Sequence, residues 1–172
     1  MHIFKPTMYK KNIFEINYNK LKEMGITCLV FDLDNTLGLI DQKKCPNDAK
    51  KLIKELQNDF LVLISSNNTK DRVEPYLKEL GIGGVALSMK PSTRGLRKIK
   101  KDYKLKKKEM VMIGDQLVTD VLAGRNFKIM TILVDPLGKK DLKITGLNRA
   151  IEDKIIKKYM KKGIFERGRY YE

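Results

Sequence analysis

The chain has 172 residues, of which 42% are hydrophobic and 33% are charged, and its formal net charge is +15. This length is enough for one domain with a full core, and no apolar run approaches the roughly 18 residues of a membrane span. With two cysteines and one histidine, the composition argues against a disulfide framework, a zinc site and a histidine-based mechanism. The start lacks the apolar region of a signal peptide, so we expect a cytoplasmic protein.

The first predicted elements precede the most informative stretch of the chain. Aromatic residues and lysines mix over residues 4–23, which predicts a basic lead-in and then a helical turn that ends at Gly25. The lead-in could pack on the core or lie on an anionic surface. The apolar run Cys28–Phe31 is short and rich in β-formers, so it predicts a buried strand. Asp32 and Asp34 follow it directly.

Helices and strands then alternate along the chain. The predicted elements are a helix over 46–57, a strand over 60–64, a helix over 71–80 ended by Gly81, a strand over 84–87, a basic helix over 92–103, a strand over 110–113, a short helix over 119–124 and a strand over 129–134. This alternation predicts βαβ units, a mostly parallel sheet and a three-layer α/β/α sandwich. Ligands of such sheets bind outside the carboxyl ends of the strands.

Polar side chains gather at those predicted strand ends. They are Asp32 and Asp34 after the first strand, Ser66 and Asn67 after the second, Lys90 after the third, and Asp115 with Asp120 after the fourth. Side chains two residues apart in an extended chain share a side, and two acids so placed repel each other unless a cation or a proton intervenes. Oxygen-only ligands suit Mg²⁺, which favours phosphate substrates, so the pattern predicts phosphoryl-transfer chemistry.

Each of these residues also has a purely structural interpretation. Ser66 or Asn67 could be turn residues, Asp120 could cap the helix that follows it, and Lys90 could be one more member of the basic run. That run extends over residues 90–108, where ten Lys and Arg residues stand against one Asp. The net charge itself could reflect only a solvated lysine-rich surface.

Four segments resemble the motifs of the haloacid-dehalogenase-like (HAD) phosphatases, in order and spacing. They are Asp32-Leu33-Asp34-Asn35-Thr36, Ser66-Asn67-Asn68, Lys90-Pro91 and Gly114-Asp115-Gln116-Leu117-Val118-Thr119-Asp120. The resemblance covers about residues 26–134. Within the superfamily the chain is most similar to the capless subclass IIIA and its bacterial YqeG-type proteins, a group with a mitochondrial relative that dephosphorylates phosphatidylglycerophosphate. Further matching features are Thr131-Ile132-Leu133-Val134 with Pro136, and more weakly Asn148-Arg149 with Ile151-Glu152.

The resemblance implies a role for each residue. Asp32 would attack phosphorus and form an aspartyl-phosphate, while Asp34 would act as general acid and then as general base. Ser66, with Asn67 beside it, and Lys90 would bind the phosphoryl group.

The resemblance also implies the metal ligands. Mg²⁺ would be held by Asp32, Asp115 and the backbone carbonyl of Asp34. Asp120 would hold the metal shell or orient Lys90.

The gaps between the motifs are too short for an inserted cap domain. We therefore expect a single HAD-like domain over 1–172, with its core at about 26–137, a basic lead-in over 1–25 and a basic helix and tail over 138–172. An open crevice suits a phosphorylated substrate attached to something large, such as phosphatidylglycerophosphate at the inner face of a membrane. The tail carries the apolar stripe Leu147, Ile151, Ile155 and Tyr159, which could pack on the domain or contact an anionic membrane.

Two other functions remain open at this point. The basic charge also fits a nucleic-acid-associated protein, either an end phosphatase or a silent binding module. A phosphatase of a soluble metabolite is the other alternative. The sequence predicts no oligomeric state.

Overall fold

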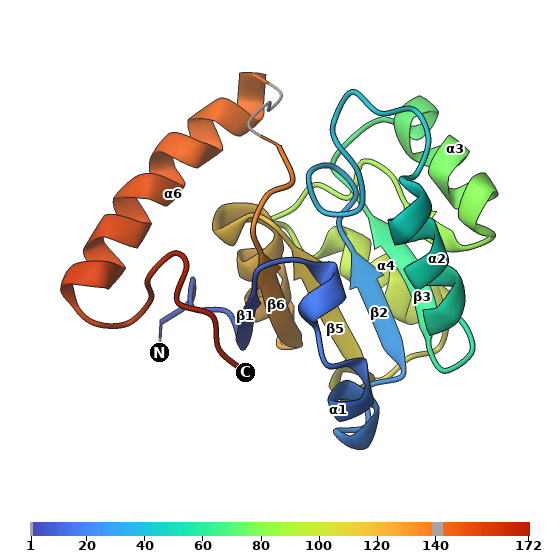
Figure 1. Cartoon of the computed structure of the whole chain (residues 1–172), viewed down its shortest axis with the longest axis horizontal. Coiled ribbons are helices and arrows are strands. Elements are labelled where there is room, and N and C mark those ends of the chain that lie inside the picture. The colour runs from blue at the N-terminus through green and yellow to red at the C-terminus, as the bar shows by residue number, and fades with distance from the viewer. Residues whose placement is uncertain (1, 139–142) are drawn as a thin grey trace.

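The computed structural model describes the backbone of residues 2–138 and 143–172, and the side chains of residues 2–138 and 150–172 (Figure 1). The described strands are β1 (Met8–Lys10), β2 (Cys28–Phe31), β3 (Leu61–Ser65), β4 (Gly83–Val85), β5 (Met110–Gly114) and β6 (Met130–Val134). The described α-helices are α1 (Tyr18–Glu23), α2 (Asn47–Leu56), α3 (Lys70–Leu80), α4 (Arg94–Asp102), α5 (Leu122–Phe127) and α6 (Lys143–Lys161). Between them lie the 3₁₀ turns η1 (Ile13–Glu15) and η2 (Lys107–Glu109) and a π-helical turn, η3 (Leu117–Val121).

The six strands form one parallel sheet in the order β1-β6-β5-β2-β3-β4. Phe31 at the end of β2 pairs with Ile64 of β3 on one side and with Ile113 of β5 on the other. Because of this register, the loops that follow the three central strands leave the sheet at the same level. The strand order reverses at β2, and parallel α/β sheets bind ligands at such a switch point.

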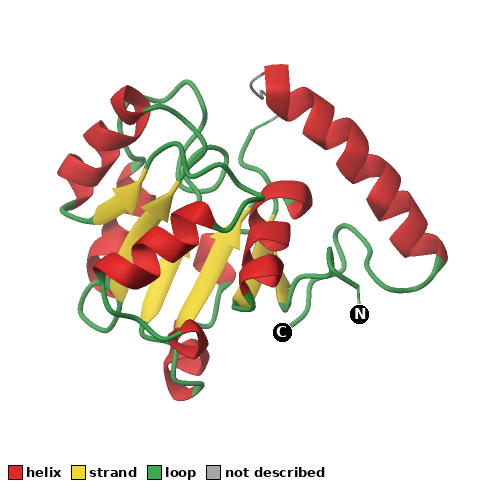
Figure 2. Ribbon diagram, turned by 180° about the vertical axis from the view of Figure 1, so that it is seen from behind, coloured by secondary structure: helices red, strands yellow, loops and turns green. Residues whose placement is uncertain are grey.

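Helices cover both faces of the sheet, as Figure 2 shows. Alternate strand residues pack against α2 and α3 on one face, for example Phe31 against the layer that contains Ile53 and Tyr76. The residues between them face α4 and α5, so that Val30 lies in a second cluster with Leu96. The three-layer α/β/α prediction is confirmed.

One strand was not predicted. β1 has only three residues and lies at the edge of the sheet, where β6 is the one strand that it pairs with among the described strands. It shows no apolar alternation that would separate it from the lysine-rich lead-in. The prediction of a helical turn before Gly25 is confirmed, because α1 ends at Glu23 and Gly25 adopts a left-handed φ of 81°. The short helix predicted over 119–124 is longer in the structure, since η3 and α5 together span 117–127.

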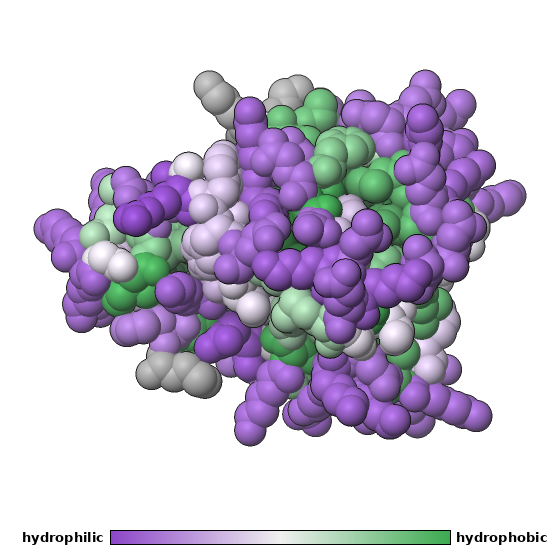
Figure 3. Space-filling model, turned by 60° about the horizontal axis from the view of Figure 1, so that its bottom comes forward, coloured by the Kyte–Doolittle hydropathy of each residue, from purple (hydrophilic) through white to green (hydrophobic). Residues whose placement is uncertain are grey.

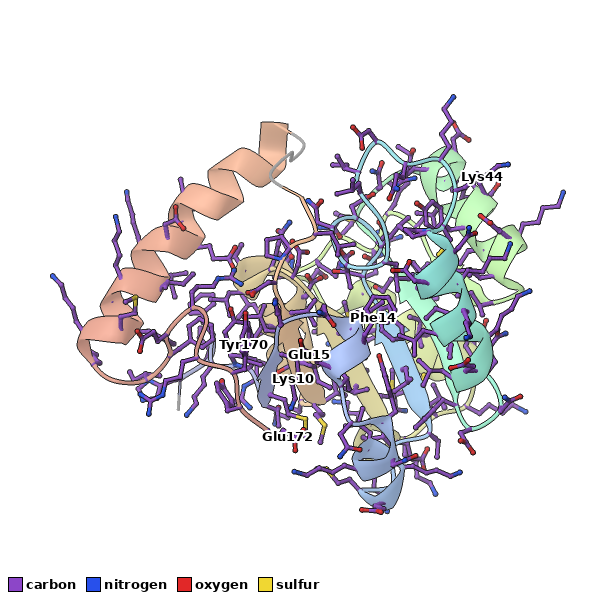
Figure 4. The ribbon with its side chains drawn as sticks, viewed as in Figure 1. Lys10, Phe14, Glu15, Lys44, Tyr170 and Glu172 are labelled. Atoms are coloured by element: carbon purple, nitrogen blue, oxygen red, sulfur yellow. The ribbon has the colours of Figure 1, made fainter. Side chains whose placement is uncertain are left out.

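The C-terminal segment returns to β1. Tyr171 exchanges two backbone hydrogen bonds with Tyr9, each 2.9 Å long. Glu172 forms ion pairs with Lys10 and with Lys20, and Figure 4 shows Lys10, Tyr170 and Glu172 gathered beside β1.

The apolar stripe predicted for the tail is correct only in part. Ile155 is partly buried and Tyr159 is buried in a cluster with Tyr9, so this part of α6 packs on the domain. Ile151 is exposed, however, and Ile156 is buried in its place, because the buried face follows the helical period of 3.6 residues instead of every fourth residue. Leu147, the remaining member of the stripe, has its side chain outside the described residues, as do Asn148 and Arg149.

The surface is dominated by charged and polar residues. On the face that Figure 3 shows, hydrophilic side chains surround smaller apolar areas. Of the helices that the structure describes, none combines the length and the apolar character needed to cross a bilayer.

Candidate active site

Asp32 occupies the point at which β2 leaves the sheet. Its backbone N–H donates a hydrogen bond of 2.8 Å to the carbonyl of Ile113, which ties the residue to the end of β5. The chain then turns sharply, with Asn35 in the left-handed region at a φ of 62°. Asparagine tolerates that region better than most residues, so the turn suits this sequence. The side chain of Asp32 therefore lies at the switch point of the sheet.

Lys90 bridges two carboxylates at this switch point. Its Nζ lies 2.6 Å from Oδ1 of Asp32 and 2.6 Å from Oδ1 of Asp120. All three residues are buried. Burial alone would lower the pKa of Lys90, but the two carboxylates outweigh it and raise this pKa, so the lysine carries its charge.

A third carboxylate, that of Asp115, completes the cluster. Oxygen atoms of Asp32, Asp115 and Asp120 all lie within 4.8 Å of one another. Burial raises the pKa of Asp32 to about 7, against the opposite effect of Lys90, and repulsion from Asp120 adds to the rise. One lysine therefore does not fully compensate the acids. A hard divalent cation fits this oxygen-only donor set.

The side chain of Asp34 lies outside that cluster. Its Oδ1 accepts hydrogen bonds from Nε and Nη2 of Arg72, at 3.0 and 2.8 Å, and its Oδ2 accepts one of 3.1 Å from the amide of Asn68. Arg72 also donates to the carbonyls of Leu39 and Gln42, and so fastens the loop after β2 to α3.

Asn67 holds the loop that carries Lys90. Its Oδ1 accepts from the backbone N–H of Lys90 at 2.7 Å and from the hydroxyl of Ser88 at 3.1 Å, and its Nδ2 donates to the Lys90 carbonyl at 2.9 Å. Both polar atoms of the Asn67 side chain are thus engaged within the protein. Ser66 is buried, and its Oγ accepts a hydrogen bond of 3.1 Å from the N–H of Asn68.

The structure adds contacts that sequence reasoning missed, those of Arg72 and those of Glu152, which the sequence marked only as part of a weak match. Arg72 had one available signal, a cation in the first turn of a helix, where the macrodipole disfavours it. Glu152 of α6 is buried and accepts a hydrogen bond of 2.7 Å from the N–H of Leu117, at the start of the turn that carries Asp120. Glu152 also pairs with Arg167 at 3.0 Å. The hydrogen bond between Glu152 and Leu117 joins residues 35 positions apart in the chain, and no local pattern predicts it.

Gly114 makes room for Asp120. A Cβ at position 114 would lie 2.3 Å from Cγ of Asp120, which is closer than atoms approach without displacement. We expect Gly114→Ala to shift Asp120, to weaken its ion pair with Lys90 and to lower turnover together with stability, the latter by about 1–3 kcal/mol. Urea unfolding and steady-state assays measure both effects. Unchanged values of both would show that Asp120 has no fixed position.

Taken together, the structure brings three acids and a lysine to the switch point of a parallel α/β sheet. The chain belongs to the haloacid dehalogenase-like hydrolase family, whose family model matches residues 3–128. A Bacillus subtilis protein named "Probable phosphatase YqeG" is 38% identical over 164 residues, which cover 93% of this chain and 94% of that protein. The chain is accordingly an enzyme, a phosphatase of this family.

Two relatives from photosynthetic organisms are more distant. The protein named phosphatidylglycerophosphate phosphatase 1 is 23% identical in Arabidopsis thaliana, over 92% of this chain and 49% of that protein. Its namesake in Chlamydomonas reinhardtii is 27% identical, over 77% of this chain and 53% of that protein. The chain therefore spans about half the length of these two relatives.

Solved structures share the fold at low sequence identity. An uncharacterized protein from Listeria monocytogenes has a TM-score of 0.55 at 17% identity, covering 73% of this chain and 97% of that one. The magnesium complex of a HAD family enzyme from Bacteroides thetaiotaomicron has a TM-score of 0.55 at 12% identity, covering 71% of this chain and 98% of that one. The cobalt-bound deoxy-D-mannose-octulosonate 8-phosphate phosphatase of Haemophilus influenzae has a TM-score of 0.52 at 17% identity, covering 84% and 95%. At these identities the likeness concerns the fold alone.

Proposed function

We propose that this phosphatase hydrolyses phosphomonoesters with Mg²⁺ through an aspartyl-phosphate on Asp32, and that its substrate is phosphatidylglycerophosphate or another large anionic phosphate. The observation that carries this proposal is the buried arrangement of Asp32, Lys90, Asp115 and Asp120 at the switch point of the sheet. Burying a lysine and two acids costs desolvation free energy, and such clusters of perturbed ionisable groups are concentrated at functional sites.

In the first step, an oxygen of Asp32 forms a bond to phosphorus as the bond between phosphorus and the leaving oxygen breaks. Lys90, 2.6 Å from Asp32, is placed to offset the charge of the nucleophile and of the phosphoryl oxygens. Ser66 accepts a hydrogen bond through Oγ, which leaves its hydroxyl proton to donate to a phosphoryl oxygen. Asn67 acts indirectly, because its amide fixes the backbone of Lys90.

Asp34 supplies the proton transfers in this proposal. It gives a proton to the leaving oxygen, then takes one from the water that attacks the aspartyl-phosphate, and free phosphate and the Asp32 carboxylate result. In the structure the Asp34 carboxylate is bound by Arg72 and Asn68. The role therefore requires Asp34 to turn away from Arg72 when a phosphorylated substrate enters the crevice.

The residues that would hold the cation are Asp32 and Asp115 with the backbone carbonyl of Asp34. Asp120, whose oxygens lie close to those of both other acids, would orient Lys90 and the cation's bound water. A bound Mg²⁺ would neutralise charge on the phosphate and favour the ionised form of Asp32.

Three observations support a large anionic substrate. The net charge is +15, and the two relatives from photosynthetic organisms are named phosphatidylglycerophosphate phosphatases. Between Asp32 and Lys90, where the structure describes every residue, the elements are the two helices α2 and α3 and the two strands β3 and β4, with no inserted domain. The motif loops are thus not covered by an inserted domain between these residues, which suits a substrate held at a membrane surface.

The test is phosphate release with Mg²⁺, measured on phosphatidylglycerophosphate in vesicles and on soluble esters that include glycerol 3-phosphate and a 5′-phosphorylated oligonucleotide. We expect kcat/KM to be higher for the lipid by about tenfold or more, because contacts with remote parts of a substrate contribute to catalysis. We also expect a metal chelator to abolish phosphate release. Preference for a soluble ester or the oligonucleotide would remove the lipid assignment. No release from any ester by folded protein would contradict the proposed function itself.

A further inference from the structure

Apolar side chains are exposed in two loops at the edge of the sheet that carries the candidate site, and we call these side chains the rim. Leu87 and Met89, in the loop after β4, are 54% and 58% exposed, and Leu137, in the loop after β6, is 47% exposed. All three follow strands of the parallel sheet, so they lie at the same edge as the acids and Lys90. Single exposed apolar side chains are common on proteins, but three at the edge of the sheet that carries the proposed site are a feature to be explained.

The backbone forces Leu87 and Met89 outward. Ser88 between them is buried, with its N–H donating to the Ser66 carbonyl at 2.9 Å and its hydroxyl donating to Asn67. Lys90, the next residue along, is buried as well. Leu87 and Met89 adopt left-handed φ angles of 50° and 58°, a conformation that residues with a Cβ rarely adopt. The loop backbone therefore adopts an unfavourable conformation at both positions, and both apolar side chains are exposed to solvent.

Leu137 lies on the other side of the crevice. Its N–H donates a hydrogen bond of 2.9 Å to the carbonyl of Asn35, in the loop that begins with Asp32 and Asp34. The apolar rim therefore flanks both loops of the proposed chemistry, that of the nucleophile and that of Lys90.

Cations line a groove beside the loop that carries Leu87 and Met89, and others are exposed on the loop before α2. A groove of about 470 Å³ between α3 and α4 starts at this loop and is lined by Lys70, Arg94 and Lys98 against one acid, Glu74. Nη1 of Arg94 lies 3.7 Å from the sulfur of Met89. Lys43 and Lys44 are also exposed, and Figure 4 shows Lys44 on the loop before α2, at the end of the molecule to which the strands point.

We propose that the rim formed by Leu87, Met89 and Leu137 docks on an anionic phospholipid bilayer, with the crevice facing the headgroups. This proposal rests on the proposed lipid substrate. Aliphatic side chains among cations match an interface that takes up apolar groups and attracts positive charge. A nucleic acid would use the cations, but it stacks its bases on aromatic side chains and gains little from Leu87 or Met89.

The matched variants replace apolar side chains without disturbing the backbone. In Leu87→Asn/Met89→Asn, both new residues tolerate the left-handed φ better than the originals, so the loop is expected to fold. The control is Met24→Asn: Met24 is 48% exposed but lies between α1 and β2, at the opposite edge of the sheet. Binding is measured by co-sedimentation with phosphatidylglycerol–phosphatidylcholine vesicles, and activity by hydrolysis of a soluble ester.

We expect the double variant to bind vesicles more weakly than the wild type by about tenfold or more. Its turnover of the soluble ester should be unchanged. Met24→Asn should bind vesicles like the wild type. Equal vesicle binding by the double variant and the wild type would overturn the proposal. So would a parallel loss of soluble-ester turnover, which would assign the loop to the catalytic site. Equally weakened binding of an oligonucleotide would make the occupant a polyanion instead of a bilayer. A wild-type protein that hydrolyses soluble esters but ignores vesicles would reject docking and leave the phosphatase chemistry intact.

Discussion

Asp32→Asn is expected to abolish turnover while the protein remains folded. The amide keeps the shape of the carboxylate, and Lys90 keeps its second partner, Asp120 at 2.6 Å. An amide oxygen is too weak a nucleophile to form the acyl-phosphate bond, so kcat should fall by about a thousandfold or more. Steady-state phosphate release measures the loss, and circular dichroism checks the fold.

The matched control is Asp71→Asn, which makes the same change at an exposed residue in the first turn of α3. It should retain wild-type turnover. If Asp32→Asn kept activity within tenfold of the wild type, Asp32 would not be the nucleophile.

Lys90→Met is expected to cost both activity and stability. Removing the ammonium leaves Asp32 and Asp120 buried without their common partner, and breaking a buried pair of this kind costs about 3–5 kcal/mol. Urea unfolding measures the stability change, and phosphate release measures the activity. Lys98→Met, at an exposed position of α4, should change stability by about 0.5 kcal/mol or less.

A double variant separates the two effects of Lys90. In Lys90→Met/Asp120→Asn, one of the two buried carboxylates that have lost Lys90 is neutralised. Part of the stability lost in Lys90→Met should therefore return. Activity should not return, because the charge beside Asp32 is still missing. Recovery of activity together with stability would mean that Lys90 serves packing alone.

The central strands were predictable because they leave clear marks in the sequence. Short β-rich runs such as Cys28–Phe31 are followed at once by polar residues, and parallel pairing brings those residues to one edge. The prediction of a mostly parallel sheet was therefore enough to place Asp32, Lys90 and Asp115 at one edge of it. The end of the helix at Gly81 could also be predicted, because glycine readily adopts the left-handed conformation that ends many helices. In the structure Gly81 has a φ of 67°.

Contacts between distant segments could not be predicted. The partner of Asp34 is Arg72, on a helix whose rotation about its own axis decides which side chain faces the loop. Glu152 reaches Leu117 from α6 across a connection that carries no recognisable pattern. The edge strand β1 was missed for a related reason, because its place depends on tertiary pairing with β6 and not on its own three residues.

The most direct test of the central claim is the location of the covalent phosphate. In the Asp34→Asn variant, p-nitrophenyl phosphate should still phosphorylate the enzyme, because its leaving group needs little protonation. Hydrolysis of the aspartyl-phosphate should be slow, because the attacking water has lost its general base. Acid quenching with ³²P-labelled substrate and peptide mapping should then place the label on Asp32, with a burst of about one p-nitrophenol for each protein chain. Label on any other residue, or on the Asp32→Asn/Asp34→Asn double variant, would contradict the account.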